Sequence, residues 1–179
     1  YGDSINLRGF SASNDITVDG VRDSAQYTRS DNFNLEALEL VNGANSAMSG
    51  AGSVGGNINL VSKTAHAGNN HDFTLGAGTD GMARLTADSN MELSDGAALR
   101  LNAMVHQNDV PDRDVERYER WGFASSFVMG LGSDTRFSVN VLHQQDDNIP
   151  EYGLPYFASY GGLLPGVDRE SYFGYANID

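Results

Sequence analysis

Long stretches that alternate between apolar and polar residues constrain the fold of this chain more than any other feature. From residue 83 to 93 the odd-numbered positions are Ala, Leu, Ala, Ser, Met and Leu, whereas the even-numbered positions are Arg, Thr, Asp, Asn and Glu. A similar period of two runs through 97–105, 121–131 and 135–143. In a β-strand, a period of two places one kind of side chain on each face. The sequence therefore predicts a mainly β protein whose strands have one apolar and one polar face.

The connections between these expected strands alternate in length. Residues 94–96 and 132–134 have the composition of tight turns, whereas 107–119 and 146–170 are long. All four prolines lie in the two long segments, where no hydrogen bond between strands is lost. Strands of ~10 residues, with short turns at one end and long loops at the other, are typical of outer-membrane β-barrels. The pattern alone also allows a soluble antiparallel sandwich, whose strands alternate in the same way.

Composition excludes several classes of protein. The chain has 179 residues, no cysteine and a formal net charge of −13. The absence of cysteine excludes a disulfide scaffold and a cysteine-ligated zinc site. The acidic balance argues against a nucleic-acid partner, which favours a basic face. No apolar run is long enough for a membrane helix. The chain begins in mid-element without a signal peptide, so we interpret it as an internal fragment of a longer protein.

The first third of the sequence has a different pattern. The Asp19-Gly20 pair between two short apolar runs predicts a hairpin. Residues 33–39 are expected to form a short helix that passes into a strand at Leu40, and residues 57–61 alternate like a strand.

Residues 50–55 match the dinucleotide-binding pattern G-x-G-x-x-G. A dinucleotide-binding enzyme requires a helix directly after that pattern. The sequence offers poor helix formers at 56–57 and a period of two at 58–61, so we interpret the glycines as part of a packed loop.

Several motifs of this first third, in the same order, resemble the plug domain of TonB-dependent outer-membrane siderophore receptors. The motifs are Arg8-Gly9-Phe10, VDGVRD at 18–23, FNLE at 33–36, LELVNG at 38–43, the glycine-rich run at 46–56 and INLVSK at 58–63. The resemblance implies a fragment of a plugged transmembrane antiparallel β-barrel with a small α+β plug domain. It assigns 1–63 to the C-terminal part of the plug, 64–71 to a linker, and 72–179 to the first five to six barrel strands, the sixth beginning near Tyr172.

The function that the resemblance implies is active uptake of a ferric siderophore across the outer membrane of a Gram-negative bacterium. The implied partners are the ferric siderophore, outer-membrane lipid, and the energy-transducing protein TonB, which contacts a segment absent from this sequence. Iron would travel within the ligand, and no covalently bound cofactor is expected. Residues 109–115, 119–122 and 148–155 resemble receptors of the catecholate type. Transport of this kind makes and breaks no bond, so neither an enzyme nor a catalytic site is expected. The alternatives are a TonB-dependent receptor for another ligand such as heme, and a passive outer-membrane barrel, which would lack a plug.

Anionic ligands with flat rings favour contact with arginine and aromatic side chains. By position in the resemblance, the expected ligand-binding residues are Ser13, Asn14, Tyr27, Arg29, Arg113, Tyr118, Tyr152, Tyr156 and Phe157. The resemblance also implies that Arg8 forms a plug–barrel ion pair with acids outside this chain. The sequence departs from the family at Asn42, Ala44 and Ala51, and the missing charge at Asn42 puts half of that ion cluster in doubt.

Neither the histidines nor the acidic loop residues predict a metal site. The four histidines are scattered without the spacing of metal ligands. Asp109, Asp112 and Asp114 alternate with Arg113 and Arg117, so we interpret this loop as self-neutralised.

Overall fold

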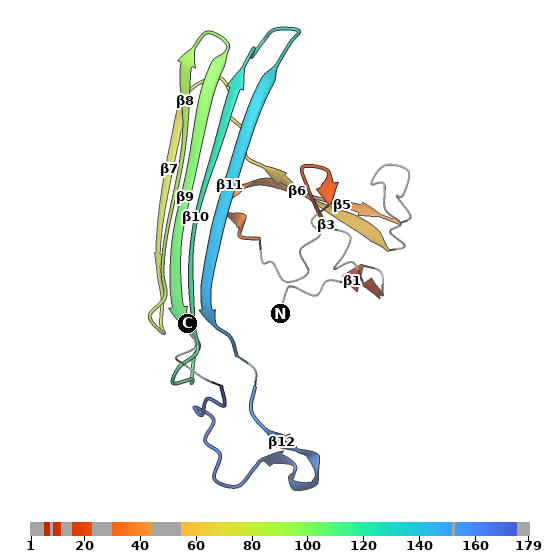
Figure 1. Cartoon of the computed structure of the whole chain (residues 1–179), viewed down its shortest axis with the longest axis vertical. Helices are drawn as coiled ribbons and strands as arrows, with labels where there is room; N and C mark the ends of the chain where they lie inside the picture. The colour runs from red at the N-terminus through yellow and green to blue at the C-terminus, as the bar shows by residue number, and fades with distance from the viewer. Residues whose placement is uncertain are drawn as a thin grey trace.

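The computed structural model describes residues 6–7, 9–11, 16–22, 30–43, 55–151 and 153–174. Its largest element is a five-stranded antiparallel sheet, which we call the wall. The strands of the wall are β7 (Asn70–Ala77), β8 (Ala83–Ser94), β9 (Ala97–Asp109), β10 (Arg117–Met129) and β11 (Phe137–Ile149). They lie side by side in sequence order and form a tall, curved sheet (Figure 1). The period-two prediction is therefore confirmed.

The wall strands extend further than the sequence predicts. β9 continues to Asp109, β10 begins at Arg117 and β11 continues to Ile149. Residues at the ends of the two expected long loops therefore belong to the sheet. Backbone pairing continues beyond the apolar part of each strand, because the ladder of hydrogen bonds does not depend on which side chains it carries. The expected sixth strand near Tyr172 is not seen in the described part of that segment, since residues 171–174 form no strand.

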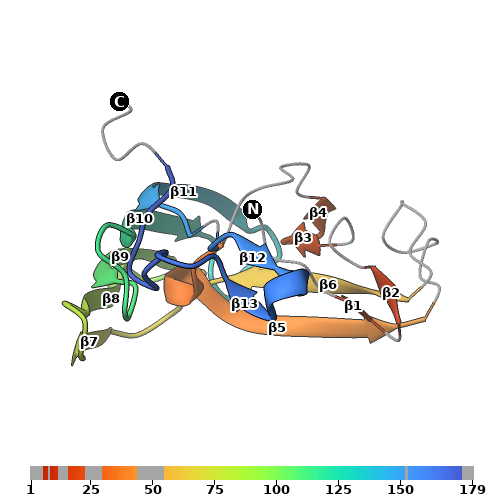
Figure 2. The ribbon, with the colours of Figure 1, turned by 90° about the horizontal axis from the view of Figure 1, so that it is seen from below.

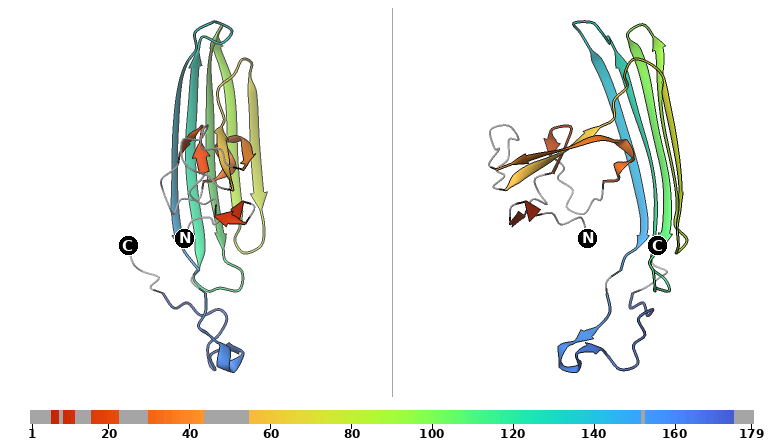
Figure 3. Two further views of the ribbon diagram at one scale, coloured as in Figure 1. Left: turned by 90° about the vertical axis from the view of Figure 1, so that its right-hand side faces the viewer. Right: turned by 180° about the vertical axis from the view of Figure 1, so that it is seen from behind.

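A second, four-stranded sheet, which we call the small sheet, projects from one face of the wall with one end toward it (Figures 1 and 3). It contains β3 (Ile16–Val18), β4 (Val21–Arg22), β5 (Leu35–Asn42) and β6 (Gly56–Ser62) in the order β4-β3-β6-β5. The hairpin at Asp19-Gly20 is confirmed, with φ of 50° and 81° at the two turn residues. Two further short pairs are β1 (Asn6–Leu7) with β2 (Phe10–Ser11), and β12 (Tyr156–Phe157) with β13 (Gly162–Leu163).

The prediction of a helix at 33–39 is wrong. Only one 3₁₀ turn forms, at Asn32–Asn34, and β5 begins immediately after it at Leu35. The side chain of Asp31 accepts a hydrogen bond from the backbone N–H of Phe33 and so caps this turn. β5 then pairs with β6 over its whole length, so tertiary pairing overrides the local apolar spacing.

The segment after the glycine-rich run is a strand and not a helix. β6 begins at Gly56 and pairs with both β3 and β5. A Cβ atom at Gly56, where φ is 146°, would lie 2.4 Å from the carbonyl oxygen of Val41, so only glycine fits this approach of two backbones. The dinucleotide-binding interpretation lacks the helix that it requires.

The polar face of the wall is covered in part, over β8, β9 and β10, whereas its apolar face is open. Buried polar side chains on the covered face include Asn90, Asn102 and Ser126. On the opposite face, the side chains of Phe73 and Leu75 are 74% and 81% exposed. A soluble sandwich buries its apolar face, so this inverted polarity is that of a sheet that faces lipid. In the ranges that the structure describes, no helix has the length and apolarity needed to cross a membrane.

Candidate functional site

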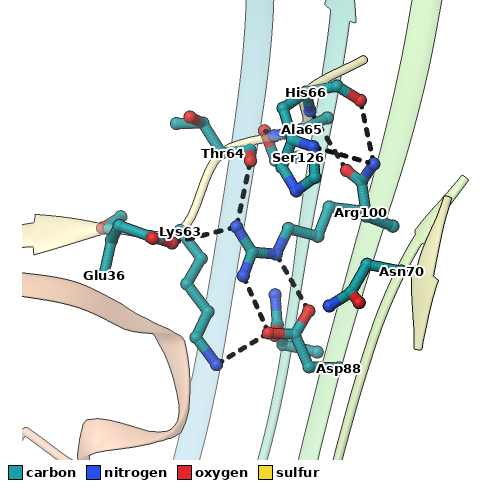
Figure 4. A network of polar contacts seen from close by, with 12 residues as sticks. Glu36, Lys63, Thr64, Ala65, His66, Asn70, Asp88, Arg100 and Ser126 are labelled. Atoms are coloured by element: carbon teal, nitrogen blue, oxygen red, sulfur yellow. Dashed lines mark hydrogen bonds and ion pairs between the residues drawn. The ribbon is translucent and has the colours of Figure 1, made fainter. Parts of the chain in front are cut away.

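Arg100 of β9 stands at the centre of a polar network between the wall and the small sheet (Figure 4). Its Nε and Nη2 donate to the two carboxylate oxygens of Asp88 at 2.9 and 2.8 Å. Its Nη1 donates to Glu36 at 3.0 Å and to the carbonyl of Thr64 at 3.2 Å. Lys63 forms an ion pair with Asp88 at 2.9 Å. We call Glu36, Lys63, Asp88 and Arg100 the inner cluster; its two cations and two anions balance, and the planar guanidinium suits the paired contact with Asp88.

The segment that joins the two sheets is itself bound to the wall. The backbone N–H of Ala65 donates to Ser126 Oγ at 3.0 Å, and that of His66 donates to Asn90 Oδ1 at 3.1 Å. The amide of Asn90 in turn donates to the carbonyls of His66 and Gly68 at 2.8 and 2.7 Å. Figure 4 shows this segment running along the wall beside Arg100. The connection therefore holds the small sheet against the wall.

A second group of charges, which we call the outer cluster, surrounds Asp31. Arg84 donates to both of its carboxylate oxygens, at 2.5 and 3.1 Å, and Arg120 donates to one at 3.2 Å. Arg120 also pairs with Asp146 of β11. Burial by itself raises the pKa of Asp31, but the hydrogen bonds and charge of Arg84, the hydrogen bond of Arg120 and the N–H of Phe33 together lower that pKa below its ordinary value. Asp31, which caps the 3₁₀ turn before β5, is thus linked by charged groups to three wall strands, β8, β10 and, through Arg120, β11.

The contribution of the outer cluster to stability is expected to fall only at acidic pH. Because the pKa of Asp31 is lower in the folded than in the unfolded chain, its stabilising contribution is present above about pH 4 and is lost as the pH falls through the folded value. Urea unfolding of the full-length protein as a function of pH should show a loss of stability in acid, an acid limb, that Asp31→Asn lacks. The Asp31→Asn variant is expected to lose about 1–3 kcal/mol of stability at pH 7.

A matched control for this titration is Asp95→Asn, which changes an exposed carboxylate in the turn between β8 and β9. It should retain the acid limb of the wild type. Identical acid limbs in the wild type and in Asp31→Asn would contradict the role given to Asp31.

An apolar contact lies between the two clusters. Phe33 is 5% exposed and packs with Met104 and Ala124 of the wall. A Cβ atom at Gly122 would lie 2.7 Å from the ring of Phe33, so the ring occupies the space that glycine leaves on β10. The small sheet is therefore fixed to the wall by one aromatic side chain as well as by charges.

The connections after β9 and β11 leave the wall at the same end, which we call the outer end, and the sequence places several expected ligand-binding residues there. Of these, Arg113 and Tyr156 line one hollow of about 450 Å³, together with Asp112, Glu151 and Arg169. Figure 2 views the molecule from this end, with β12 and β13 in front. Tyr156 is exposed, whereas the side chain of Arg113 is only 6% exposed.

Two other expected ligand-binding residues in the described ranges do not line this hollow. Tyr118 belongs to strand β10, and Phe157, 48% exposed, belongs to β12. The other predicted ligand-binding residues lie outside the described residues: Ser13, Asn14, Tyr27, Arg29 and Tyr152. Arg8, predicted to form a plug–barrel ion pair, lies outside them too. The departures at Ala44 and Ala51 lie outside them as well. In the part of the chain that the structure describes, no three histidine or acidic side chains are grouped as metal ligands.

Sequence reasoning missed the residues that hold the small sheet on the wall. Arg84, Asp88 and Arg100 were recognised only as members of a polar face. A signal was available, because a charge on a membrane-spanning strand requires a partner on the lumenal side. The sequence does not indicate which residue of the first third provides that partner.

Comparison with known proteins identifies the family. Residues 1–57 match the family model described as TonB-dependent Receptor Plug Domain. The chain is 36% identical over 183 residues to the probable TonB-dependent siderophore receptor PiuA of Acinetobacter baumannii, an alignment that covers 99% of this chain and 24% of PiuA. The chain belongs to the TonB-dependent receptors. It spans about a quarter of the length of this curated relative.

Solved structures of TonB-dependent receptors share the fold. The crystal structure of PiuA superposes with a TM-score of 0.83 at 37% identity, over 89% of this chain and 23% of that one. The open form of the ferric-catecholate import receptor Fiu from Escherichia coli K12 superposes with a TM-score of 0.86 at 31% identity, over 96% of this chain and 28% of that one. The pyoverdine outer-membrane receptor FpvA of Pseudomonas aeruginosa gives 0.77 at 25% identity, covering 88% and 24%.

The chain is therefore mainly β and is a fragment of a plugged, transmembrane antiparallel barrel of the outer membrane. The wall is part of that barrel, and the small sheet falls largely within the region that matches the plug model. The named relatives are receptors, and Fiu is an import receptor.

Proposed function

We propose that the full-length protein imports a ferric siderophore of the catecholate type across the outer membrane, driven by TonB. The observation that carries this proposal is the 36% identity to the catecholate siderophore receptor Fiu over 170 residues, which covers 95% of this chain. The docked small sheet supports an active mechanism over a passive pore, because a passive barrel needs no plug.

In this proposal the parts of the chain have separate roles. Residues 1–63 belong to the plug, 64–71 link it to the barrel, and 72–179 form the first strands of the barrel. The exposed apolar face of the wall contacts outer-membrane lipid. TonB engages a segment outside this sequence. Iron travels in the ligand without a covalently bound cofactor, and no catalysed reaction is involved.

The ligand in this proposal lies at the outer end, between the plug and the barrel loops. Tyr156 and Phe157 offer exposed aromatic surface there, which suits flat catecholate rings. The other proposed contacts are Ser13, Asn14, Tyr27, Arg29, Tyr118 and Tyr152. Arg113, which the sequence also predicts as a contact, directs its guanidinium to groups of the protein itself. The role proposed for Arg8 is an ion pair between plug and barrel.

Binding and uptake by the full-length receptor test the proposal. A ferric tris-catecholate complex should bind more tightly than a ferric hydroxamate or hemin, and cells should accumulate the labelled iron only when TonB is functional. Arg29→Ala should weaken catecholate binding by roughly 10-fold, the loss of one charge-assisted contact. Tighter binding of hemin would favour the heme alternative, and uptake without TonB would favour a passive barrel. An unchanged Kd in Arg29→Ala would remove that residue from the site.

A further inference from the structure

One arginine connects the two outer loops of the wall. Arg113, in the loop 110–116 between β9 and β10, donates from Nη1 to the backbone carbonyl of Arg169 at 2.7 Å. Its Nε and Nη2 contact Oε1 of Glu116 at 2.8 and 2.5 Å, and Nε lies 3.8 Å from Glu151. A backbone hydrogen bond from Asp114 to the carbonyl of Glu170, at 3.4 Å, runs beside these contacts. In the described residues, the side-chain hydrogen bonds and ion pairs that join the loop 110–116 to the segment 150–174 thus all involve Arg113.

The pair of Arg113 and Glu116 is buried although it lies in loops. The side chain of Glu116 is 0% exposed and that of Arg113 is 6% exposed. Within the described ranges, Oε2 of Glu116 has no hydrogen-bond partner, so Arg113 provides the charge that balances this carboxylate. A buried pair of this kind is strongly destabilised when one partner is removed. Segment 150–174 therefore depends on Arg113 for its position.

The same contacts leave Arg113 little capacity to bind a ligand. Its three donor groups face Glu116, Glu151 and a backbone carbonyl. Arg169 lines the same hollow with an exposed side chain, and within the described residues no hydrogen bond or ion pair of its guanidinium is found. The two arginines of the hollow thus differ: the guanidinium of Arg113 is buried and paired, whereas Arg169 is exposed.

We propose that Arg113 is a positioning residue that holds segment 150–174 in place and so forms the outer hollow before ligand arrives. This inference rests on the proposed function in one respect, namely that the hollow is where ligand binds. A loop that is ordered in advance costs less entropy on binding, so ligand associates faster and more tightly. The cation that faces an anionic ligand in the hollow is Arg169.

Hydrogen exchange in the full-length receptor without ligand tests the positioning role by itself. Arg113→Ala should raise the exchange rates of amides in 153–174 by at least about 10-fold, the effect of losing about 1.4 kcal/mol of local stability. Arg169→Ala is the matched control, since it removes a cation from the same hollow but keeps the backbone carbonyl that Arg113 binds. Glu116→Gln, which keeps the shape of the buried side chain, should give a smaller increase than Arg113→Ala. Unchanged exchange in Arg113→Ala overturns the inference.

Binding kinetics of a ferric tris-catecholate complex separate positioning from contact. Arg113→Ala should lower the association rate constant and leave the salt dependence of affinity unchanged, whereas Arg169→Ala should reduce that salt dependence. A reduced salt dependence in Arg113→Ala would mean that Arg113 contacts the ligand and would overturn its positioning role. If the wild-type receptor binds no ferric complex, the proposed function fails, and the exchange experiment still decides whether Arg113 orders the segment.

Discussion

Replacing Arg100 by alanine should release the small sheet from the wall and lower the free energy of unfolding of the full-length receptor by about 3–5 kcal/mol. The substitution removes the partner of Asp88, Glu36 and the Thr64 carbonyl in one step. Lys63 would be the only cation left in the inner cluster. Urea unfolding measures the loss, and hydrogen exchange of 62–68 shows whether the connecting segment leaves the wall.

Two further variants serve as references for the loss of stability expected in Arg100→Ala. Arg117→Ala removes an arginine whose side chain is 56% exposed and whose pairing with Glu119 is 3.4 Å long, and it should cost less than about 1 kcal/mol. Arg100→Lys keeps the charge but loses the planar fork, so its cost should lie between the other two. Equal losses in Arg100→Ala and Arg117→Ala would show that the inner cluster does not hold the small sheet.

Replacing Phe33 by alanine should cost about 3–5 kcal/mol, because it empties the apolar contact between the 3₁₀ turn and the wall. The ring lies against Met104, Ala124 and Gly122, and its own side chain is almost fully buried. Urea unfolding of the full-length receptor measures this loss.

The reciprocal change at Gly122 tests the same contact from the wall. Gly122→Ala should destabilise by about 1–3 kcal/mol, because its methyl group would lie 2.7 Å from the ring. Combining it with Phe33→Leu, which frees space near that methyl group, should cost less than the sum of the two single changes. Strict additivity would show that the ring and residue 122 do not share the space seen in the structure.

The strands of the wall could be predicted from sequence because each pairs with its neighbour along the chain and each carries its own alternation. The ends of the strands could not, since polar residues such as Gln107 and Glu119 pair as readily as apolar ones. The helix expected at 33–39 failed for the opposite reason. Apolar spacing there is compatible with a helix, but pairing with β6, about 20 residues further on, decides the outcome.

The contacts between plug and wall could not be predicted because they join residues far apart in sequence. Alternation shows that Arg84 and Arg120 are on the polar face of their strands, but not that both meet Asp31. Likewise, loop composition suggests that Arg113 is exposed, whereas packing of segment 150–174 buries it. In both cases, a segment distant in sequence decides whether the charged side chain is paired or buried, and the local sequence pattern does not identify that segment.

The two-faced wall also limits how this protein can change length during evolution. Inserting or deleting one residue within β9 would exchange its faces and place Arg100 and Asn102 toward lipid. An arginine facing the middle of a bilayer costs about 2–4 kcal/mol, and the inner cluster would lose its centre as well. Length changes are therefore confined to the connections, above all to 110–116 and 150–174. Relatives can diversify in what they recognise there while the wall and its docked sheet stay the same.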